Sequence, residues 1–195
     1  MAVWAWILIG IGAIVVVGAA VLAEVQRRTA RLRGRFGPEY ARLKELRGRR
    51  DAEGELTERE RRREELDIRP LSPSARERYI ARWQLVQARF VDAPQPAVRE
   101  ADDLISQVMR ERGYPVDDFE QRAADVSVDH SDVVADYRKA NRLVVSSDAT
   151  TEDLRQAMQH YRALFDELVE PAADEPTAAE RAEAPAQAHE EAVRR

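Results

Sequence analysis

The chain opens with a run of apolar residues, from Ala2 to Ala23, that contains no charged side chain. A helix over this run is roughly 33 Å long at about 1.5 Å per residue, which is enough to cross a hydrocarbon core of about 30 Å. Because a backbone in lipid must satisfy its own hydrogen bonds, such a run favours a membrane-spanning helix. Trp4 and Trp6 lie near its start, where amphipathic rings favour the headgroup level. The pattern predicts a transmembrane anchor over residues 1–23.

A cleavable signal peptide is the alternative for this segment. Val21-Leu22-Ala23 has the small residues of a cleavage site, but no basic residue precedes the run, and the run is longer than the apolar region of a signal peptide. Basic residues remain on the cytoplasmic side of a span. We therefore expect the C-terminal part to be cytoplasmic, at a bacterial cell membrane. The expected membrane-interface arginines are Arg27, Arg28, Arg31, Arg33 and Arg35.

Charged residues dominate the next segment, residues 24–71, and its apolar positions are sparse. We expect the first helix to break at Gly37-Pro38, and Pro38 to open a new helix, because proline suits the first helical turn. A helix that is polar all round is stabilised by opposite charges three or four residues apart. The segment thus predicts a long charged helical stalk, with a coiled coil as the alternative. Pro70 and Pro73 end it.

Apolar residues recur at spacings of three and four from residue 72 to residue 169, which is typical of amphipathic helices. Four long helices are expected, at about 74–91, 96–112, 132–146 and 151–169, with a short one at about 118–126. Gly113 suits a left-handed cap, Thr150 and Asp153 have capping-box spacing, and Asp129 or Ser131 is expected to cap the helix at 132–146. We predict an all-α chain with a four-to-five-helix bundle.

Composition changes this picture at both ends of the chain. Residues 24–50 carry a net charge of +7 next to the expected anchor, whereas the rest is acidic. This distribution favours membrane lipid as a partner and disfavours nucleic acid. The tail, residues 170–195, is rich in alanine, glutamate and proline and is expected to be disordered. The absence of cysteine agrees with a reducing compartment.

Candidate chemistry is limited to three groups of residues. Carboxylates spaced for one helix face at Asp125, Asp129, Asp132 and Asp136 would suit a hard cation, but capping roles and solvation explain them more simply. His160 flanks an apolar stripe and is typical of a boundary residue. Aromatic residues in the bundle are typical of a core, with a ligand pocket as the alternative. Neither a cofactor motif nor a catalytic motif is found, and we predict no cofactor, no metal site and no enzyme.

Several stretches resemble one family of uncharacterised bacterial, mainly actinobacterial, proteins with a single N-terminal span. They are FGPEY (36–40), IRPL (68–71), RYIARWQLVQARFVDAPQPAV (78–98), MRERGYPVDDFEQRAADVSVDH (109–130) and TEDLRQAMQHYRALFDELV (151–169). The resemblance implies the same single-span architecture. It implies no activity, because none is established for that family.

These features predict a membrane-anchored helical adaptor or scaffold that binds a protein partner. A sensor domain that binds a small molecule, and an enzyme with a site at the acidic patch, are the alternatives. Association of the chain with itself through the span or the stalk is a further alternative.

Overall fold

The computed structural model describes residues 2–146 and 148–170, with side chains from residue 15 onward. The described residues form seven helices and no strand. The helices are α1 (Ala2–Arg47), α2 (Arg49–Glu65), α3 (Pro73–Arg89), α4 (Pro94–Arg112), α5 (Phe119–Val126), α6 (Val134–Val145) and α7 (Thr151–Val169). The chain is therefore all-α, as its apolar periodicity predicts.

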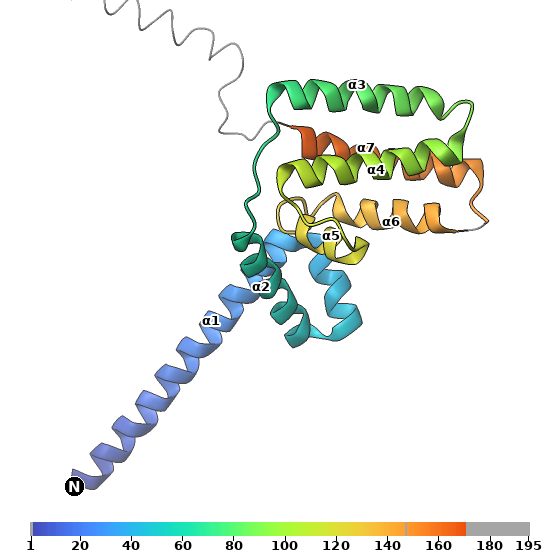
Figure 1. Ribbon diagram of the computed structural model, residues 1–195. Helices are drawn as coiled ribbons and strands as arrows, with labels where there is room; N and C mark the ends of the chain where they lie inside the picture. Colours follow the sequence, from blue (N-terminus) through green and yellow to red (C-terminus); the bar gives the residue numbers. More distant parts are fainter. Residues whose placement is uncertain (1, 147, 171–195) are drawn as a thin grey trace, which may run out of the picture.

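The first half of α1 projects alone from the rest of the protein (Figure 1). Its exposed apolar side chains include Val15, Val16, Val17, Val21 and Leu22, which are 57–68% exposed. Within the described part of the chain, no helix is both long enough and apolar enough to span a membrane. The larger part of the predicted span, including Trp4 and Trp6, lies outside the described side chains. The transmembrane prediction is therefore not supported by the structure.

A kink at Gly37 reverses the direction of α1. Gly37 has φ 42° and ψ −115°, a conformation that glycine adopts without the steric cost of a Cβ atom. The next residue, Pro38, has no backbone N–H, so the helical hydrogen bond that would cross this point is lost. The predicted break at Gly37-Pro38 is confirmed. The chain then turns again at Gly48, where φ is 80°.

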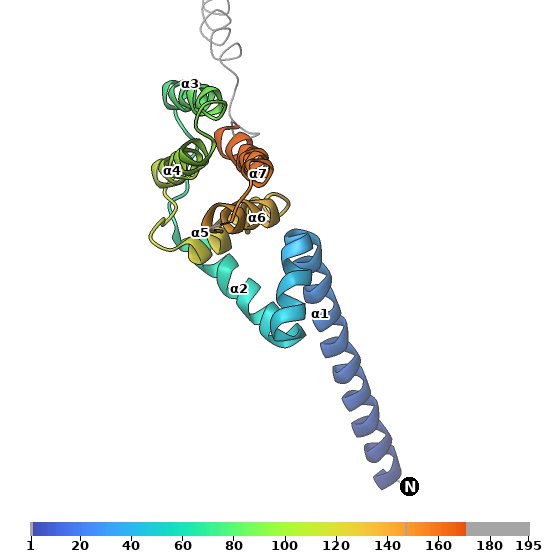
Figure 2. The ribbon, with the colours of Figure 1, turned by 90° about the vertical axis from the view of Figure 1, so that its right-hand side faces the viewer.

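The segment after the exposed part of α1 folds back on itself into a helical hairpin, residues 24–65, which we call the charged hairpin (Figure 2). The helical segments before Gly37, between Gly37 and Gly48, and after Gly48 enclose a separate small core of Leu32, Phe36, Tyr40, Leu43, Ala52 and Leu56, to which the bundle adds Val128. The prediction of a long stalk is therefore wrong. The apolar side chains of α1 and α2 bury each other instead of lying along an extended helix.

The bundle, residues 72–169, forms as its periodicity predicts. The four long helices pack side by side in the order α3, α4, α7, α6 around one core, in which α4 and α7 are central. Trp83 and Phe165 stack with ring centroids 4.5 Å apart. The Thr150–Asp153 capping box is present. The tail from residue 171 onward lies outside the described residues.

Gly113 joins the linker before the bundle to the end of α4. It has φ 100° and caps the helix in the left-handed conformation. A Cβ atom here would also lie 2.3 Å from the carbonyl oxygen of Asp67. The adjacent Arg69 N–H donates to the carbonyl of Arg112 at 2.9 Å. The linker is thereby fixed to the bundle, and it places the end of α2 beside α5.

Candidate functional site at the junction of hairpin and bundle

A buried cluster of charges joins the charged hairpin to the bundle. Glu39 is at its centre, with a fully buried side chain. Its Oε1 atom accepts hydrogen bonds from Arg42 and Arg59, both at 3.0 Å, and from Arg138 at 3.4 Å. The side chains of Arg59 and Arg138 are only 5% and 3% exposed. We call Glu39, Arg59 and Arg138 the junction triad, because its members come from α1, α2 and α6.

Each arginine of the triad has further partners that fix its direction. Arg59 donates to Glu55 at 2.7 Å and to the Ser127 hydroxyl at 3.1 Å. Ser127 in turn donates to the carbonyl of Ala124 at 2.6 Å. Arg138 pairs with Glu120. A buried ion pair needs such additional hydrogen bonds, because removing charged groups from water costs several kcal/mol per ion, on the order of the attraction regained.

The kink in α1 explains how Glu39 comes to this position. Glu39 follows Pro38, in the first turn of the helical segment after the kink, where the helix dipole favours a negative charge. The carbonyl of Arg35, just before the kink, accepts the Ser131 hydroxyl at 2.8 Å. The Arg35 guanidinium reaches the carbonyl of Val128 at 3.4 Å. Arg35, two residues before the kink, thus makes two bonds to the bundle.

The predicted cap of α6 is wrong, because the Ser131 hydroxyl binds the carbonyl of Arg35 instead of the start of α6. The residue at the N-cap is Val133, which makes no side-chain capping bond. Asp129 also has another role, since it pairs with Arg63 of the charged hairpin and accepts the Tyr114 hydroxyl at 2.9 Å. Both candidate caps hold other parts of the fold instead.

The acidic residues near the junction do not converge on a common point. The helix ends at Val126, so Asp125, Asp129, Asp132 and Asp136 do not share one helix face. Asp125 is buried and accepts Gln121 at 2.7 Å, and burial raises the pKa of its carboxyl. Among the described residues, His, Asp and Glu nowhere form a group of three that could hold a metal ion. Nearby, Asp118 caps α5, and Glu120 and Asp136 each pair with a cation.

The other sequence candidates lie at structural positions. His160 Nδ1 is 3.5 Å from Asp136 Oδ1 at the edge of the bundle. Trp83, Tyr137 and Tyr161 are core residues that are at most 4% exposed. Their aromatic character at helical spacing is thus explained by packing.

A second polar cluster inside the bundle is absent from the sequence interpretation. Asp102 Oδ2 is 3.7 Å from Arg122, and its Oδ1 atom accepts the Tyr137 hydroxyl at 3.5 Å. Burial raises the pKa of the Asp102 carboxyl, although the Arg122 charge opposes this. The one signal of this cluster in the sequence is the position of Asp102, a carboxylate that follows Ala101 and lies beside the apolar stripe of α4. The cluster is enclosed by aromatic rings, since Arg122 lies 5.5 Å from the ring centre of Phe119.

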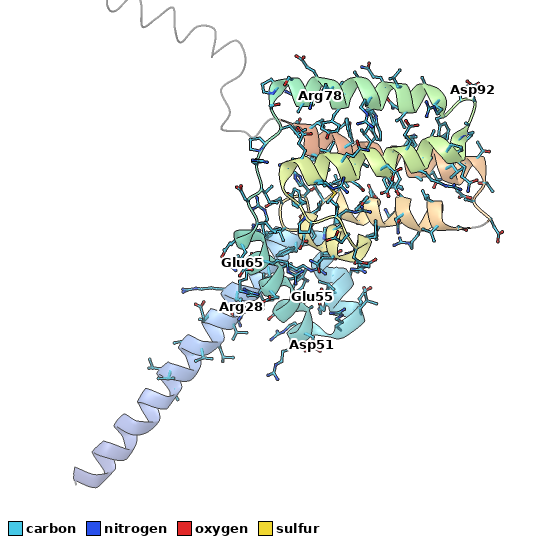
Figure 3. All side chains as sticks on the ribbon, viewed as in Figure 1. Arg28, Asp51, Glu55, Glu65, Arg78 and Asp92 are labelled. Atoms are coloured by element: carbon cyan, nitrogen blue, oxygen red, sulfur yellow. The ribbon has the colours of Figure 1, made fainter. Side chains whose placement is uncertain are left out.

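The predicted membrane-interface arginines fall into two groups. Three of them face α2: Arg28 donates to Thr57 at 2.7 Å, and Arg31 and Arg35 pair with Glu60 at 2.7 and 3.0 Å. Figure 3 labels Arg28 on α1, beside α2. Arg27 and Arg33 have neither an ion pair nor a side-chain hydrogen bond within the described part of the chain. The first group stabilises the hairpin, and only the second is free to meet a ligand.

Comparison with known proteins finds no matching family model, no matching curated protein and no matching solved structure. The resemblance to the single-span bacterial family therefore stays a prediction.

Proposed function

We propose that this protein is a membrane-anchored helical adaptor, which presents a rigid bundle to a protein partner at the cytoplasmic face of a bacterial membrane. The observation that supports the anchor is the lone first half of α1. Its consecutive valines at positions 15–17 are 62–68% exposed, with no other helix beside them (Figures 1 and 2). Contiguous apolar surface of this kind marks contact with a membrane or a partner. The uncharged residues 2–14 extend the same helix.

Charge supports the orientation. The segment that follows the apolar run is rich in arginine, with a net charge of +7 over residues 24–50. Cytoplasmic retention of basic residues then places the charged hairpin and the bundle in the cytosol. The junction triad connects the anchor to the bundle through buried bonds, so the bundle has a fixed direction relative to α1.

A groove between α3 and α7 is the partner surface that we propose. Its cavity volume is about 430 Å³, and its walls include Ile80, Trp83 and Phe165. The buried Trp83 indole N–H has no hydrogen-bond partner in the described structure. Arg76, at the same groove, makes no ion pair within the described residues. A partner with an acceptor group beside an apolar side chain would satisfy these groups.

Fractionation and a reporter fusion test the anchor and its direction. The full chain should sediment with membranes and resist extraction at alkaline pH, whereas a variant that lacks residues 2–23 should be soluble. Alkaline phosphatase fused after Val169 should be inactive, because this reporter folds only after export. Strong phosphatase activity would overturn the orientation, and alkaline extraction of the full chain would overturn the anchor.

Site-specific photo-crosslinking in cells tests the partner surface. A photoreactive residue at Gln84, which is exposed beside the groove, should give one discrete crosslinked product. Asp103, exposed on α4 and not at the groove, is the matched control and should give none. Arg76→Gln should reduce the product at position 84. Equal products at positions 84 and 103 would contradict a partner site at this groove.

A further inference from the structure

A second groove lies on the charged hairpin, between α1 and the first residue of α2. It has a cavity volume of about 390 Å³. Its lining includes the apolar or small residues Val25, Ala30 and Gly34, and at its edge are Arg33 and Arg49. The space above Gly34 is open, because a Cβ atom there would meet nothing within 4 Å. The groove begins directly after the exposed apolar part of α1.

The fold turns this groove toward the proposed membrane. After the kink at Gly37, the chain runs back toward the N-terminal end of α1, so that the turn between α1 and α2 points in the same general direction as the projecting helix (Figure 1). Arg49 follows this turn immediately and lines the groove together with Val25. Residues that are far from the apolar run in sequence are therefore brought next to its end.

The charge at the groove is positive and largely unbalanced. Arg33 has no acidic partner within the described residues, and Arg49 is 3.6 Å from Glu53 with its own side chain 59% exposed. Glu53 is only 14% exposed and is shared, since it also accepts Thr29 at 2.8 Å and Tyr40 at 3.3 Å. Two guanidinium groups beside an apolar floor match the phosphate and the first methylenes of a lipid.

The tip of the charged hairpin has the composition of an interfacial segment. Leu46 is 66% exposed there. Lys44 and Arg50 flank it and make no ion pair in the part of the chain that the structure describes. Exposed Glu45 and Asp51 lie in the same stretch, so basic residues are in excess at the tip but are not alone there. An exposed apolar side chain beside basic ones is typical of segments that lie in the headgroup region, with the apolar group inserted and the charges at the phosphates.

We propose that this groove binds the phosphate headgroup of an anionic phospholipid, held by Arg33 and Arg49, while Leu46 enters the interfacial layer of the bilayer. The inference rests on the proposed membrane anchor. It separates the basic residues of this region by role: Arg28, Arg31 and Arg35 hold the hairpin together, and Arg33 and Arg49 select the lipid.

Native mass spectrometry of the full chain in detergent, with added phosphatidylglycerol or phosphatidylcholine, tests the headgroup site. Phosphatidylglycerol should bind in preference. Each basic residue near anionic lipid contributes on the order of 1 kcal/mol, so Arg33→Gln with Arg49→Gln should weaken phosphatidylglycerol binding by about 5- to 30-fold. The matched control is Arg99→Gln with Arg110→Gln, two exposed arginines of α4, and it should change nothing.

The depth of the tip is a second and independent readout. The chain has no cysteine, so Leu46→Cys offers a single labelling position. A nitroxide there should be accessible to oxygen and shielded from a water-soluble nickel reagent in vesicles that contain phosphatidylglycerol. Leu85→Cys on α3 is the matched control, because Leu85 is 69% exposed, and its label should remain in water.

The outcomes separate the groove from the anchor. If the chain inserts into vesicles but binds both lipids equally, or if the label at position 46 is as aqueous as that at position 85, the groove proposal is overturned and the anchor stands. An unchanged lipid preference in the double variant also overturns it. If the chain does not insert at all, the anchor and the groove proposal both fail.

Discussion

Removing the charge of Glu39 should detach the charged hairpin from the bundle. Glu39→Gln keeps the shape of the side chain but removes the charge that neutralises Arg59 and Arg138, which are 5% and 3% exposed. Breaking a buried pair in this way costs about 3–5 kcal/mol, because an uncompensated charge remains buried. Glu55 and Glu120 still contact the two arginines, so we expect the lower end, about 3 kcal/mol. Arg42 adds little, since exposed pairs contribute about 0–1 kcal/mol.

Hydrogen exchange of the full chain in detergent, read by peptide, locates this loss. The amides of α2 and of the second half of α1 should exchange about 100-fold faster in Glu39→Gln, because about 3 kcal/mol corresponds to roughly two orders of magnitude in the opening equilibrium. The core amides of α4 and α7 should change much less. Glu58→Gln is the matched control, as Glu58 is on α2, 49% exposed, and pairs only with a surface arginine.

Two results would refute the reasoning. One is a loss under about 1 kcal/mol with unchanged exchange of α2, which would mean that the two guanidinium groups are stable without the Glu39 charge. The other comes from replacing the whole junction triad with leucine. Well-packed apolar residues often substitute for a buried ionic group at little cost, so the triple variant should lose less stability than Glu39→Gln. A larger loss would show that the charges themselves stabilise the fold.

Three further predictions concern the rest of the chain. Trp83→Ala should destabilise the bundle by about 3–5 kcal/mol in urea unfolding, because it removes a buried ring that stacks on Phe165; a loss under about 1 kcal/mol would contradict a core role. Burial, together with Glu111, raises the pKa of Tyr79 to about 12, and burial also raises the pKa of the other four tyrosines. The stability from these raised pKa values is fully present below about pH 10 and is lost as the pH rises through the folded-state values. The absorbance of tyrosinate at 295 nm should therefore rise only as the helical circular dichroism signal disappears. Tyrosine ionisation near pH 10 in a chain that is still folded would refute this. Calorimetric titration with Mg²⁺, Ca²⁺ or Mn²⁺ should give only weak, salt-sensitive heats, because the carboxylates of the acidic patch do not converge; a micromolar site abolished by Asp129→Asn would overturn that expectation.

The bundle could be predicted from the sequence because its apolar periodicity is local. Each helix from α3 to α7 shows its buried face within a few turns, and capping signals such as Thr150 with Asp153 mark its ends. The cap of α6 could not be predicted in the same way. Ser131 and Asp129 have suitable side chains, but both bind the charged hairpin, and these partners are distant in the sequence.

The charged hairpin could be predicted from the sequence only in part. Leu32, Phe36, Tyr40 and Leu43 follow one another at spacings of four, four and three, which is a buried stripe, but the stripe crosses Gly37-Pro38 and is obscured by the surrounding charges. The junction triad could not be predicted from the sequence. Glu39 meets its partners at sequence separations of 20 and 99 residues, and a glutamate among arginines has the composition of a solvated helix. Only the fold distinguishes a buried carboxylate from an exposed one.

The kink at Gly37 has a consequence for the volume of cytosol that an anchored bundle could sample. A straight helix over residues 24–71 would hold the bundle about 70 Å from the bilayer. Because α1 turns back at Gly37, only about 20 Å of helix separates Ala23 from that turn. A bundle tethered in this way occupies a thin layer along the membrane, and a cytosolic protein large enough to be excluded from that layer would be a poor partner. Small proteins, or proteins that are themselves confined to the membrane surface, would encounter it at a high local concentration.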